Sequence, residues 1–315
     1  MTQTLQLALL QHACPVGASK EDNLATCERM IREAASDGAQ LIVTQELFAG
    51  HYFPQVEDES RFDWAEPIPG PTSKRLAALA DELEVTISGS FFEKRTAGVY
   101  HNTTATFGPD GERIGLYRKM HIPDDPRFYE KYYFTPGDLG WQTFDVLYEQ
   151  GIAAETAATL RVAGTRVGTL VCWDQWFPEA ARLTALKGAG LLLYPTAIGY
   201  YNDAEQGEPA DVREQQLAAW QTMMRSHAIA NGVFVAAANR IGVENDLTFW
   251  GSSFVCGPDG GVLAQASRDT EEVLQVRVDL SLIETQRRGW PFLRDRRIDA
   301  YDPLLDRLSD EDAPT

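Results

Sequence analysis

Hydrophobic positions along the chain follow two spacings, which alternate from the N-terminal end onward. Residues 5–11 form a short apolar run, residues 20–36 place apolar side chains on one face of a helix, and residues 41–43 are apolar throughout. This pattern predicts a strand, a helix and a second strand. The same alternation returns in residues 72–83 and 86–92, which are predicted as a helix and the strand after it.

The rest of the chain continues the alternation and adds two hairpins. Pro109-Asp110-Gly111 and Pro258-Asp259-Gly260-Gly261 are turn sequences, and each lies between two apolar runs. The strands predicted in this part are 102–107, 113–118, 167–171, 191–194, 233–238, 253–256, 262–265 and 273–278, and the helices are 215–230 and one that begins within 174–181.

The order of these elements is β-α-β-α-β, a hairpin, β-α-β-α-β and a second hairpin. No linker rich in Gly, Ser or Pro interrupts it, and no repeat of solenoid length is present. We therefore expect one domain over residues 1–308 and a polar tail at 309–315. The expected fold is α/β, an α-β-β-α sandwich in which two mixed sheets pack together and helices lie outside.

Composition and charge narrow the functional class. Hydrophobic residues make up 44% of the 315 positions, which supports a large core, and no apolar run is long enough to span a bilayer. The net charge of −18 argues against nucleic acid and anionic membranes as partners. The chain start lacks a secretory signal and the four scattered cysteines include no CxxC pair, so we expect a cytoplasmic protein without metal, disulfide or cofactor.

Three side chains capable of chemistry follow directly after predicted strands or hairpins. Glu46 follows residues 41–43, Lys119 ends the first hairpin, and Cys172 follows residues 167–171. Sites in α/β proteins are built at such strand ends. Because Cys172 also lies near a predicted helix N-terminus, its thiol would have a lowered pKa and backbone N–H groups would be free to bind an oxyanion.

Hydrolysis by a cysteine needs a nucleophilic sulfur, a proton carrier and a pocket for the negative oxygen of the tetrahedral intermediate. We expect Cys172 to attack, Glu46 to carry the proton, and Lys119 with the backbone N–H after Cys172 to hold the oxygen. The spacing alone leaves open whether the three side chains meet, because most cysteines are buried structural residues and a carboxylate after a strand is often a cap.

These residues lie in segments that resemble the three signature segments of the nitrilase superfamily of carbon–nitrogen hydrolases. The segments are Gln45-Glu46-Leu47-Phe48, Arg118-Lys119-Met120-His121-Ile122-Pro123 and Cys172-Trp173-Asp174-Gln175-Trp176-Phe177-Pro178-Glu179. Within the superfamily the chain is most similar to N-carbamoylputrescine amidohydrolases, on the segments Asp124-Asp125-Pro126, Phe134-Thr135-Pro136-Gly137-Asp138, Tyr194-Pro195-Thr196-Ala197-Ile198-Gly199 and Arg294-Asp295-Arg296-Arg297. The resemblance covers nearly the whole chain in the right order.

The resemblance implies the α-β-β-α fold and a catalytic triad of Glu46, Lys119 and Cys172, with Glu130 as a second glutamate that supports the lysine. It also implies subunits paired through their sandwich faces, as a homodimer or a higher homo-oligomer. The expected reaction is hydrolysis of a small-molecule N-carbamoyl amine or amide, foremost N-carbamoylputrescine, to amine, CO₂ and ammonia through a cysteine thioester. The substrate-binding residues expected with this reaction are Tyr52, Trp173, Thr196, Ala197 and Tyr201.

Two departures from the family pattern leave the substrate open. Residues 146–159 are extra sequence before the strand that leads to Cys172. Tyr200-Tyr201 stand where putrescine-type members carry Ser-Glu, which resembles an anchor for the distal amine of the substrate. Asp203 or Glu205 could replace that carboxylate.

Alternative functions are weighed against this interpretation. The same fold would suit an ω-amidase or an N-carbamoyl amino acid hydrolase similar to β-ureidopropionase, but an anionic substrate needs an Arg or Lys clamp and residues 188–212 contain neither. A cationic or neutral N-carbamoyl amine is therefore favoured. Outside enzymes, the alternative is a catalytically silent binding protein. No motif supports a papain-like histidine base such as His227, or a metal site at His51 and His121.

Overall fold

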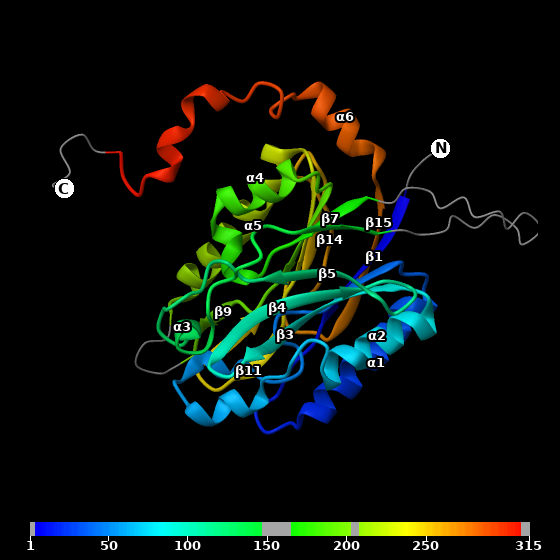
Figure 1. Ribbon diagram of the computed structural model, residues 1–315, viewed down its shortest axis with the longest axis vertical. Helices are drawn as coiled ribbons and strands as arrows, with labels where there is room; N and C mark the ends of the chain where they lie inside the picture. The colour runs from blue at the N-terminus through cyan, green and yellow to red at the C-terminus, as the bar shows by residue number, and fades with distance from the viewer. Residues whose placement is uncertain (1–3, 147–164, 203–207, 310–315) are drawn as a thin grey trace, which may run out of the picture.

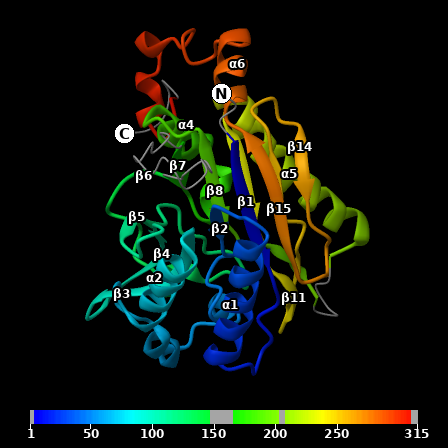
Figure 2. The same ribbon diagram turned by 90° about the vertical axis from the view of Figure 1, so that its right-hand side faces the viewer.

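The computed structural model describes residues 4–146, 165–202 and 208–309, and in it two six-stranded sheets pack face to face (Figures 1 and 2). Helices cover the outer face of each sheet, which gives the layer order helix, sheet, sheet, helix. The α-β-β-α sandwich predicted from the sequence is therefore confirmed. Most of the extra segment at 146–159 and residues 310–315 of the predicted tail lie outside the described residues.

The first sheet has the strand order β15-β1-β2-β3-β4-β5. Its strands are β1 (Thr4–Gln11), β2 (Leu41–Val43), β3 (Thr86–Thr96), β4 (Val99–Phe107), β5 (Arg113–Arg118) and β15 (Glu272–Asp279). β1, β2 and β3 are parallel, whereas β4, β5 and β15 pair antiparallel with their neighbours. Helices α1 (Lys20–Ser36) and α2 (Pro71–Leu83) connect the parallel strands and pack on the outer face.

The second sheet has the order β14-β13-β10-β8-β7-β6. Its strands are β6 (Thr143–Asp145), β7 (Arg166–Thr169), β8 (Leu191–Pro195), β10 (Phe234–Ala238), β13 (Phe254–Cys256) and β14 (Val262–Gln265). β7, β8 and β10 are parallel, so the carboxyl ends of these three strands meet at one edge. Helices α4 (Pro178–Leu186) and α5 (Ala210–Asn231) cover its outer face.

The core between the sheets is apolar because the central strands are buried on both faces. Leu7 and Leu9 of β1 pack with Leu193 of β8 between the two sheets. The residues that alternate with them, Ala8 and Leu10, pack with the apolar face of α1 instead. Full burial of one leucine side chain stabilises the fold by about 1.5–3 kcal/mol. Because β1 buries side chains on both of its faces, it stabilises the layer between the sheets and the layer under α1.

Smaller elements complete the fold. A third sheet has the order β11-β12-β9, and its strands are β9 (Gly199–Tyr201), β11 (Ile241–Glu244) and β12 (Leu247–Trp250). The remaining helices are α3 (Glu130–Tyr133) and α6 (Ser281–Gly289), with 3-10 turns at Phe53–Gln55, Glu59–Trp64, Cys172–Trp176, Ile298–Ala300 and Asp302–Leu305. The sequence pattern predicted neither this small sheet, whose strands are too short to show alternation, nor α6, none of whose residues is buried. No helix within the described ranges is both long and apolar enough to cross a membrane.

The C-terminal segment, residues 281–308, leaves the sandwich and extends past α4 (Figure 1). Its exposed large apolar side chains are Leu282, Trp290, Phe292, Ile298, Tyr301, Leu304, Leu305 and Leu308. Helix α4 also exposes Leu183 and Leu186. Exposed large apolar side chains are therefore frequent on this segment and on the neighbouring face of α4.

Candidate active site

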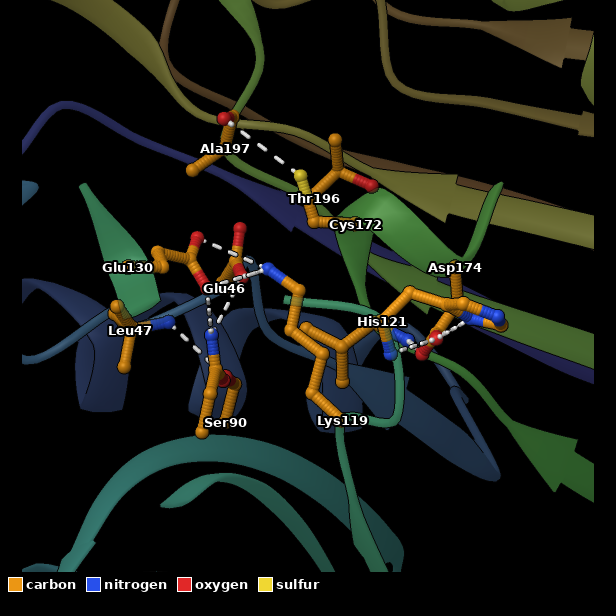
Figure 3. A network of polar contacts seen from close by, with 12 residues as sticks. Glu46, Leu47, Ser90, Lys119, His121, Glu130, Cys172, Asp174, Thr196 and Ala197 are labelled. Atoms are coloured by element: carbon orange, nitrogen blue, oxygen red, sulfur yellow. Dashed lines mark hydrogen bonds and ion pairs between the residues drawn. The ribbon is translucent and has the colours of Figure 1, made fainter. Parts of the chain in front are cut away.

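The structure brings four of the predicted residues together where strands of both sheets end. Glu46 follows β2 and Lys119 follows β5 in the first sheet, whereas Cys172 follows β7 in the second (Figure 3). Glu130, the first residue of α3, completes the group. All four side chains are buried. The site therefore spans the interface between the two sheets.

Lys119 lies at the centre of this group and bonds to both carboxylates. Its Nζ donates to Glu46 Oε1 at 2.9 Å and to Glu130 Oε1 and Oε2 at 2.9 and 2.7 Å. Burial by itself would lower the pKa of Lys119, but the carboxylates of Glu130 and Glu46 outweigh burial and hold that pKa above its usual value. The lysine is therefore a cation at any physiological pH.

Two neutral side chains also donate hydrogen bonds to the carboxylates of Glu46 and Glu130. Tyr52 Oη donates to Glu130 Oε1 at 2.6 Å, and Asn102 Nδ2 donates to Glu46 Oε1 at 2.7 Å. The other oxygen of Glu46, Oε2, is buried and has no hydrogen-bond partner among the described residues. One oxygen of Glu46 is thus held in place while the second is available to accept a proton.

Cys172 opens the 3-10 turn Cys172–Trp176 with a positive φ of 38°. The first hydrogen bond that closes this turn runs from Asp174 N to Val171 O at 3.0 Å. The backbone N–H groups of Cys172 and Trp173 precede that bond and are not used within the turn. Free N–H groups next to a nucleophile are the kind of donor that an oxyanion pocket uses.

The lowered thiol pKa expected from the sequence is wrong. Burial, and then the charge of the Glu46 carboxylate, raises the pKa of the Cys172 thiol well above its usual value, although Lys119 opposes the shift. The prediction rested on a nearby helix N-terminus, whereas the sulfur is buried and Cys172 opens a short 3-10 turn, which is too short to act as a strong dipole. The thiol is therefore protonated, and a base is needed to remove its proton before the sulfur can attack.

Asp174 ties the backbone near the lysine to the backbone near the cysteine. Its Oδ1 accepts from His121 N at 3.1 Å and lies 2.8 Å from His121 Nδ1, and its Oδ2 accepts from Val171 N at 3.0 Å. His121 is two residues beyond Lys119, and Val171 precedes Cys172. A single buried carboxylate therefore fixes the two functional side chains relative to each other (Figure 3).

A buried ion pair between Arg240, which follows β10, and Glu244, the last residue of β11, holds the loop that carries Glu46. Arg240 donates to the Glu244 carboxylate at 2.8 and 3.0 Å, and also to the backbone oxygens of Glu46 (2.7 Å) and Leu47 (3.1 Å). Glu244 in turn accepts from Tyr52 N at 2.5 Å. The pair thus positions both Glu46 and Tyr52 without entering the site itself.

A cavity of about 310 Å³ lies beside Cys172 and is within the size range of small-molecule sites. Three of the predicted substrate-binding residues, Trp173, Ala197 and Tyr201, line it. Most of its remaining wall is aromatic or aliphatic, and the carboxylates of Asp125 and Glu208 face it as well. A larger cavity of about 650 Å³ elsewhere is lined by none of the four clustered residues, so the smaller cavity is the candidate substrate site.

The other two predicted substrate-binding residues do not line this cavity. Tyr52 lies against Glu130, to which its hydroxyl donates, and so supports the charged cluster. Thr196 is buried, and its hydroxyl donates to the backbone oxygen of Tyr194 at 2.9 Å. Asp203 and Glu205, considered as anchors for a distal amine, lie outside the described residues.

Two other kinds of chemistry were considered from the sequence, a papain-like histidine base and a metal site. His227, a candidate base, is buried with its Nε2 2.7 Å from the backbone oxygen of Gln175. Over residues 4–146, 165–202 and 208–309, no three His, Cys, Asp or Glu side chains form a group that could hold a metal ion.

Sequence reasoning missed four residues of the site. Asn102 had one local signal, since it is a polar residue at the start of a predicted strand, and Asp174 stood within the signature segment around Cys172. Arg240 had none, because it contacts residues far away in the sequence, and no local pattern places Glu208 at the cavity. Their roles become visible only in three dimensions.

The sequence pattern that defines the carbon-nitrogen hydrolase family matches residues 6–288. This chain belongs to that family. The hydrolase is 44% identical over 308 residues to an N-carbamoylputrescine amidase of Solanum lycopersicum, covering 95% of this chain and 94% of that protein. It is 38% identical to a citrullinase of Francisella tularensis subsp. tularensis, covering 91% and 94%. A crystal structure of a carbon-nitrogen hydrolase from Helicobacter pylori G27 matches with a TM-score of 0.85 at 42% identity, covering 96% and 99%.

These findings confirm the family and the enzyme class inferred from the signature segments. The hydrolase has the nitrilase-superfamily fold, and it is an enzyme that hydrolyses carbon–nitrogen bonds.

Cysteine labelling tests which thiol the cavity makes reactive. We expect iodoacetamide to modify Cys172 alone in the folded hydrolase, because only this cysteine lines the cavity. Cys14, Cys27 and Cys256 are buried elsewhere and line no part of this cavity. Peptide mass spectrometry reads out the modified positions, and the denatured chain, which should take up four groups, is the control. Comparable labelling of any other cysteine would contradict the assignment.

Proposed function

We propose that the hydrolase cleaves the ureido group of an N-carbamoyl amine, foremost N-carbamoylputrescine, to the free amine, CO₂ and ammonia. In this proposal Cys172 is the nucleophile, Glu46 carries the proton, Lys119 binds the developing oxyanion and Glu130 holds Lys119. The observation that carries the proposal is the combination of this buried cluster with a cavity whose ionisable lining is acidic.

In the first half-reaction Cys172 transfers its thiol proton to the free oxygen of Glu46 and attacks the ureido carbon. The tetrahedral oxygen accepts hydrogen bonds from the Trp173 backbone N–H and from Lys119. Because Glu130 contacts Lys119 through both oxygens, the lysine can redirect one N–H donor toward the substrate. The bond to the unsubstituted nitrogen then breaks, and Glu46 returns the proton so that ammonia leaves.

In the second half-reaction water hydrolyses the carbamoyl thioester on Cys172. The water gives one proton to Glu46 and attacks the same carbon, while Lys119 again holds the oxygen. The C–S bond breaks and the proton returns to the sulfur. The released N-carboxy amine decomposes to CO₂ and the amine, so one ureido group and one water give one amine, one CO₂ and one ammonia.

The charge of the cavity favours a cationic or neutral amine over an anionic substrate. Asp125 and Glu208 line the cavity, and none of its described lining residues is a lysine or an arginine. Substrates of an ω-amidase or of an N-carbamoyl amino acid hydrolase carry a carboxylate, which requires a cationic clamp. Both alternatives are therefore less well supported.

Two arginines near this region, Arg240 and Arg213, contact other groups of the chain. Arg240 is fully buried and bonds to Glu244 and to backbone oxygens. Arg213 lies over the ring of Tyr200 at 4.3 Å and donates to the backbone oxygen of Tyr201 at 3.4 Å. Neither arginine lines the cavity beside Cys172.

We further propose a homodimer or a multiple of it, supported by the exposed apolar side chains of the C-terminal segment and α4. A single domain over 1–308 is supported by the pairing of β1 with β15, which joins both ends of the chain in one sheet. A cytoplasmic location is supported by four free cysteine thiols. There the released diamine would supply polyamine biosynthesis.

Removal of the nucleophile tests the reaction itself. Cys172→Ala should abolish ammonia release from N-carbamoylputrescine, whereas Cys14→Ala, Cys27→Ala and Cys256→Ala should retain most of it. The reason is that only Cys172 lies beside the base and the cavity. Ammonia release and mass-spectrometric detection of the thioester in the wild type are the measurements. Substantial turnover by Cys172→Ala would contradict the proposed mechanism.

Removal of the cation tests the oxyanion pocket. Lys119→Ala should lower kcat by at least about a hundredfold, the loss typical of one oxyanion donor, and Glu130→Ala should also be severely impaired. The exposed Lys131→Ala is the matched control and should be near wild type. Circular dichroism distinguishes lost catalysis from lost fold. An increase in KM alone would assign Lys119 to substrate binding instead.

Light scattering tests the assembly. We expect a mass of two chains or a multiple of two at micromolar concentration. Ile298→Glu should shift the distribution toward smaller species, because this side chain is 71% exposed on the C-terminal segment and would be covered in an assembly. A monodisperse monomer of the wild type would refute the proposal.

A further inference from the structure

The larger cavity, of about 650 Å³, lies against the loop that follows Glu46. Residues 47 and 49–51 of this loop all line it. None of its described lining residues also lines the cavity beside Cys172, so the two cavities are separate. Its volume is within the range of small-molecule sites. The proposed reaction makes no use of it.

The inner wall of this cavity is aromatic. Phe53, Phe91 and Phe92 line it and are buried. The rings of Phe53 and Phe92 stack with centroids 4.9 Å apart, and the ring of Trp64 lies edge-on to Phe53 at 5.8 Å. Trp64 also lines the cavity and is 38% exposed, so it borders the solvent. A flat ring placed here gains stacked and edge-on contacts.

The charged side chains of the cavity are paired with one another. Lys20 and Glu66 both line it and form an ion pair. Arg61 lines it as well, and its Nε is 3.1 Å from Asp58 Oδ2. An anionic ligand would therefore have to compete with a carboxylate that is already in place. Asp63, a further lining residue, is exposed to water and attracts a cation only weakly. The charges thus favour an uncharged ligand.

Two polar groups of the lining residues are suited to such a ligand. Thr72 is buried, and its Oγ1 has no hydrogen-bond partner among the described residues. Burial, and then the charges of Arg61 and Arg240, lowers the pKa of His51 to about 4, so its ring is neutral and offers one donor and one acceptor. A hydroxyl or an amide can both donate and accept, and can therefore pair with either group.

We infer that this cavity is a second binding site, for an uncharged ring compound that carries a hydroxyl or an amide group, and that its occupant acts on turnover through the loop after Glu46. Leu47 N donates to Ser90 Oγ at 3.0 Å, and both residues line the cavity. A ligand in the cavity therefore contacts the backbone that positions Glu46. The binding site does not depend on the proposed function, whereas the effect on turnover rests on it.

Three probes that share one ring system and differ in charge test the ligand class. They are 2-naphthol, 2-naphthoate and 2-naphthylmethylammonium. By calorimetry at pH 7, 2-naphthol should bind the wild type at least about tenfold more tightly than either ion, because an ion pays for its desolvation without gaining a partner. It should also raise the melting temperature, because it binds the folded chain.

Variants at the edge of the cavity locate the bound probe. Val16 lines the cavity and is 48% exposed, so Val16→Trp can fill this space without disturbing the core. This variant should weaken 2-naphthol binding at least about tenfold. Val262→Trp is the matched control, because Val262 is 44% exposed on β14 and does not line the cavity. Should Val16→Trp fold poorly, Trp64→Ala removes a ring of the wall and should weaken binding as well.

Kinetics test the effect on Glu46. Saturating 2-naphthol should change kcat for N-carbamoylputrescine at least about twofold and leave KM unchanged, since it contacts the loop of the base and not the substrate. The effect should be absent in Val16→Trp and present in Val262→Trp.

The outcomes separate this inference from the proposed function. If 2-naphthol does not bind the wild type, or if Val16→Trp and Trp64→Ala both bind it normally, the second site is wrong. Binding without a change in kcat would overturn its effect on Glu46, and an increase in KM alone would place the probe in the substrate cavity. If the wild type does not cleave N-carbamoylputrescine, the proposed function fails, while calorimetry still decides whether the second site exists.

Discussion

The site depends on one buried cation. Lys119 is fully enclosed, and an isolated ammonium in such a place would be destabilised by several kcal/mol. Its contacts with Glu46 and Glu130 remove that penalty, and each carboxylate in turn depends on the lysine. The three side chains therefore form one electrostatic unit rather than three separate contributions. The contact between Lys119 and one oxygen of Glu46 holds both side chains in place and leaves the second oxygen of Glu46 without a partner among the described residues.

The site as a whole draws on both sheets, because Cys172 follows β7 of the second sheet, and buried polar groups hold its parts together. Strand ends bring the residues near each other, but the loops that follow are irregular and need further support. Asp174 bonds the lysine loop to the cysteine turn, and Arg240 reaches from the second sheet to the backbone of Glu46. Residues that never touch a substrate thus set the geometry on which turnover depends.

The sequence allowed the fold class to be predicted because its signals are local. Residues 20–36 and 41–43 became a helix and a strand with the predicted bounds, since a one-sided apolar face, a Ser19 cap and a short apolar run all act within a few residues. Glu46, Lys119 and Cys172 were predicted because they follow such strands. The sign of the thiol pKa shift and the role of Arg240 were out of reach. They depend on enclosure and on partners distant in the sequence, which no local pattern encodes.

The backbone of Cys172 lies in the left-handed region, with φ of 38°, where a residue with a side chain is destabilised by about 1–2 kcal/mol relative to glycine. Glycine would relieve the strain but has no sulfur. Stability and turnover therefore favour different residues at this one position. A lineage that kept the fold and no longer needed catalysis would gain stability by replacing Cys172 with glycine. Selection for stability alone would therefore favour loss of the proposed nucleophile.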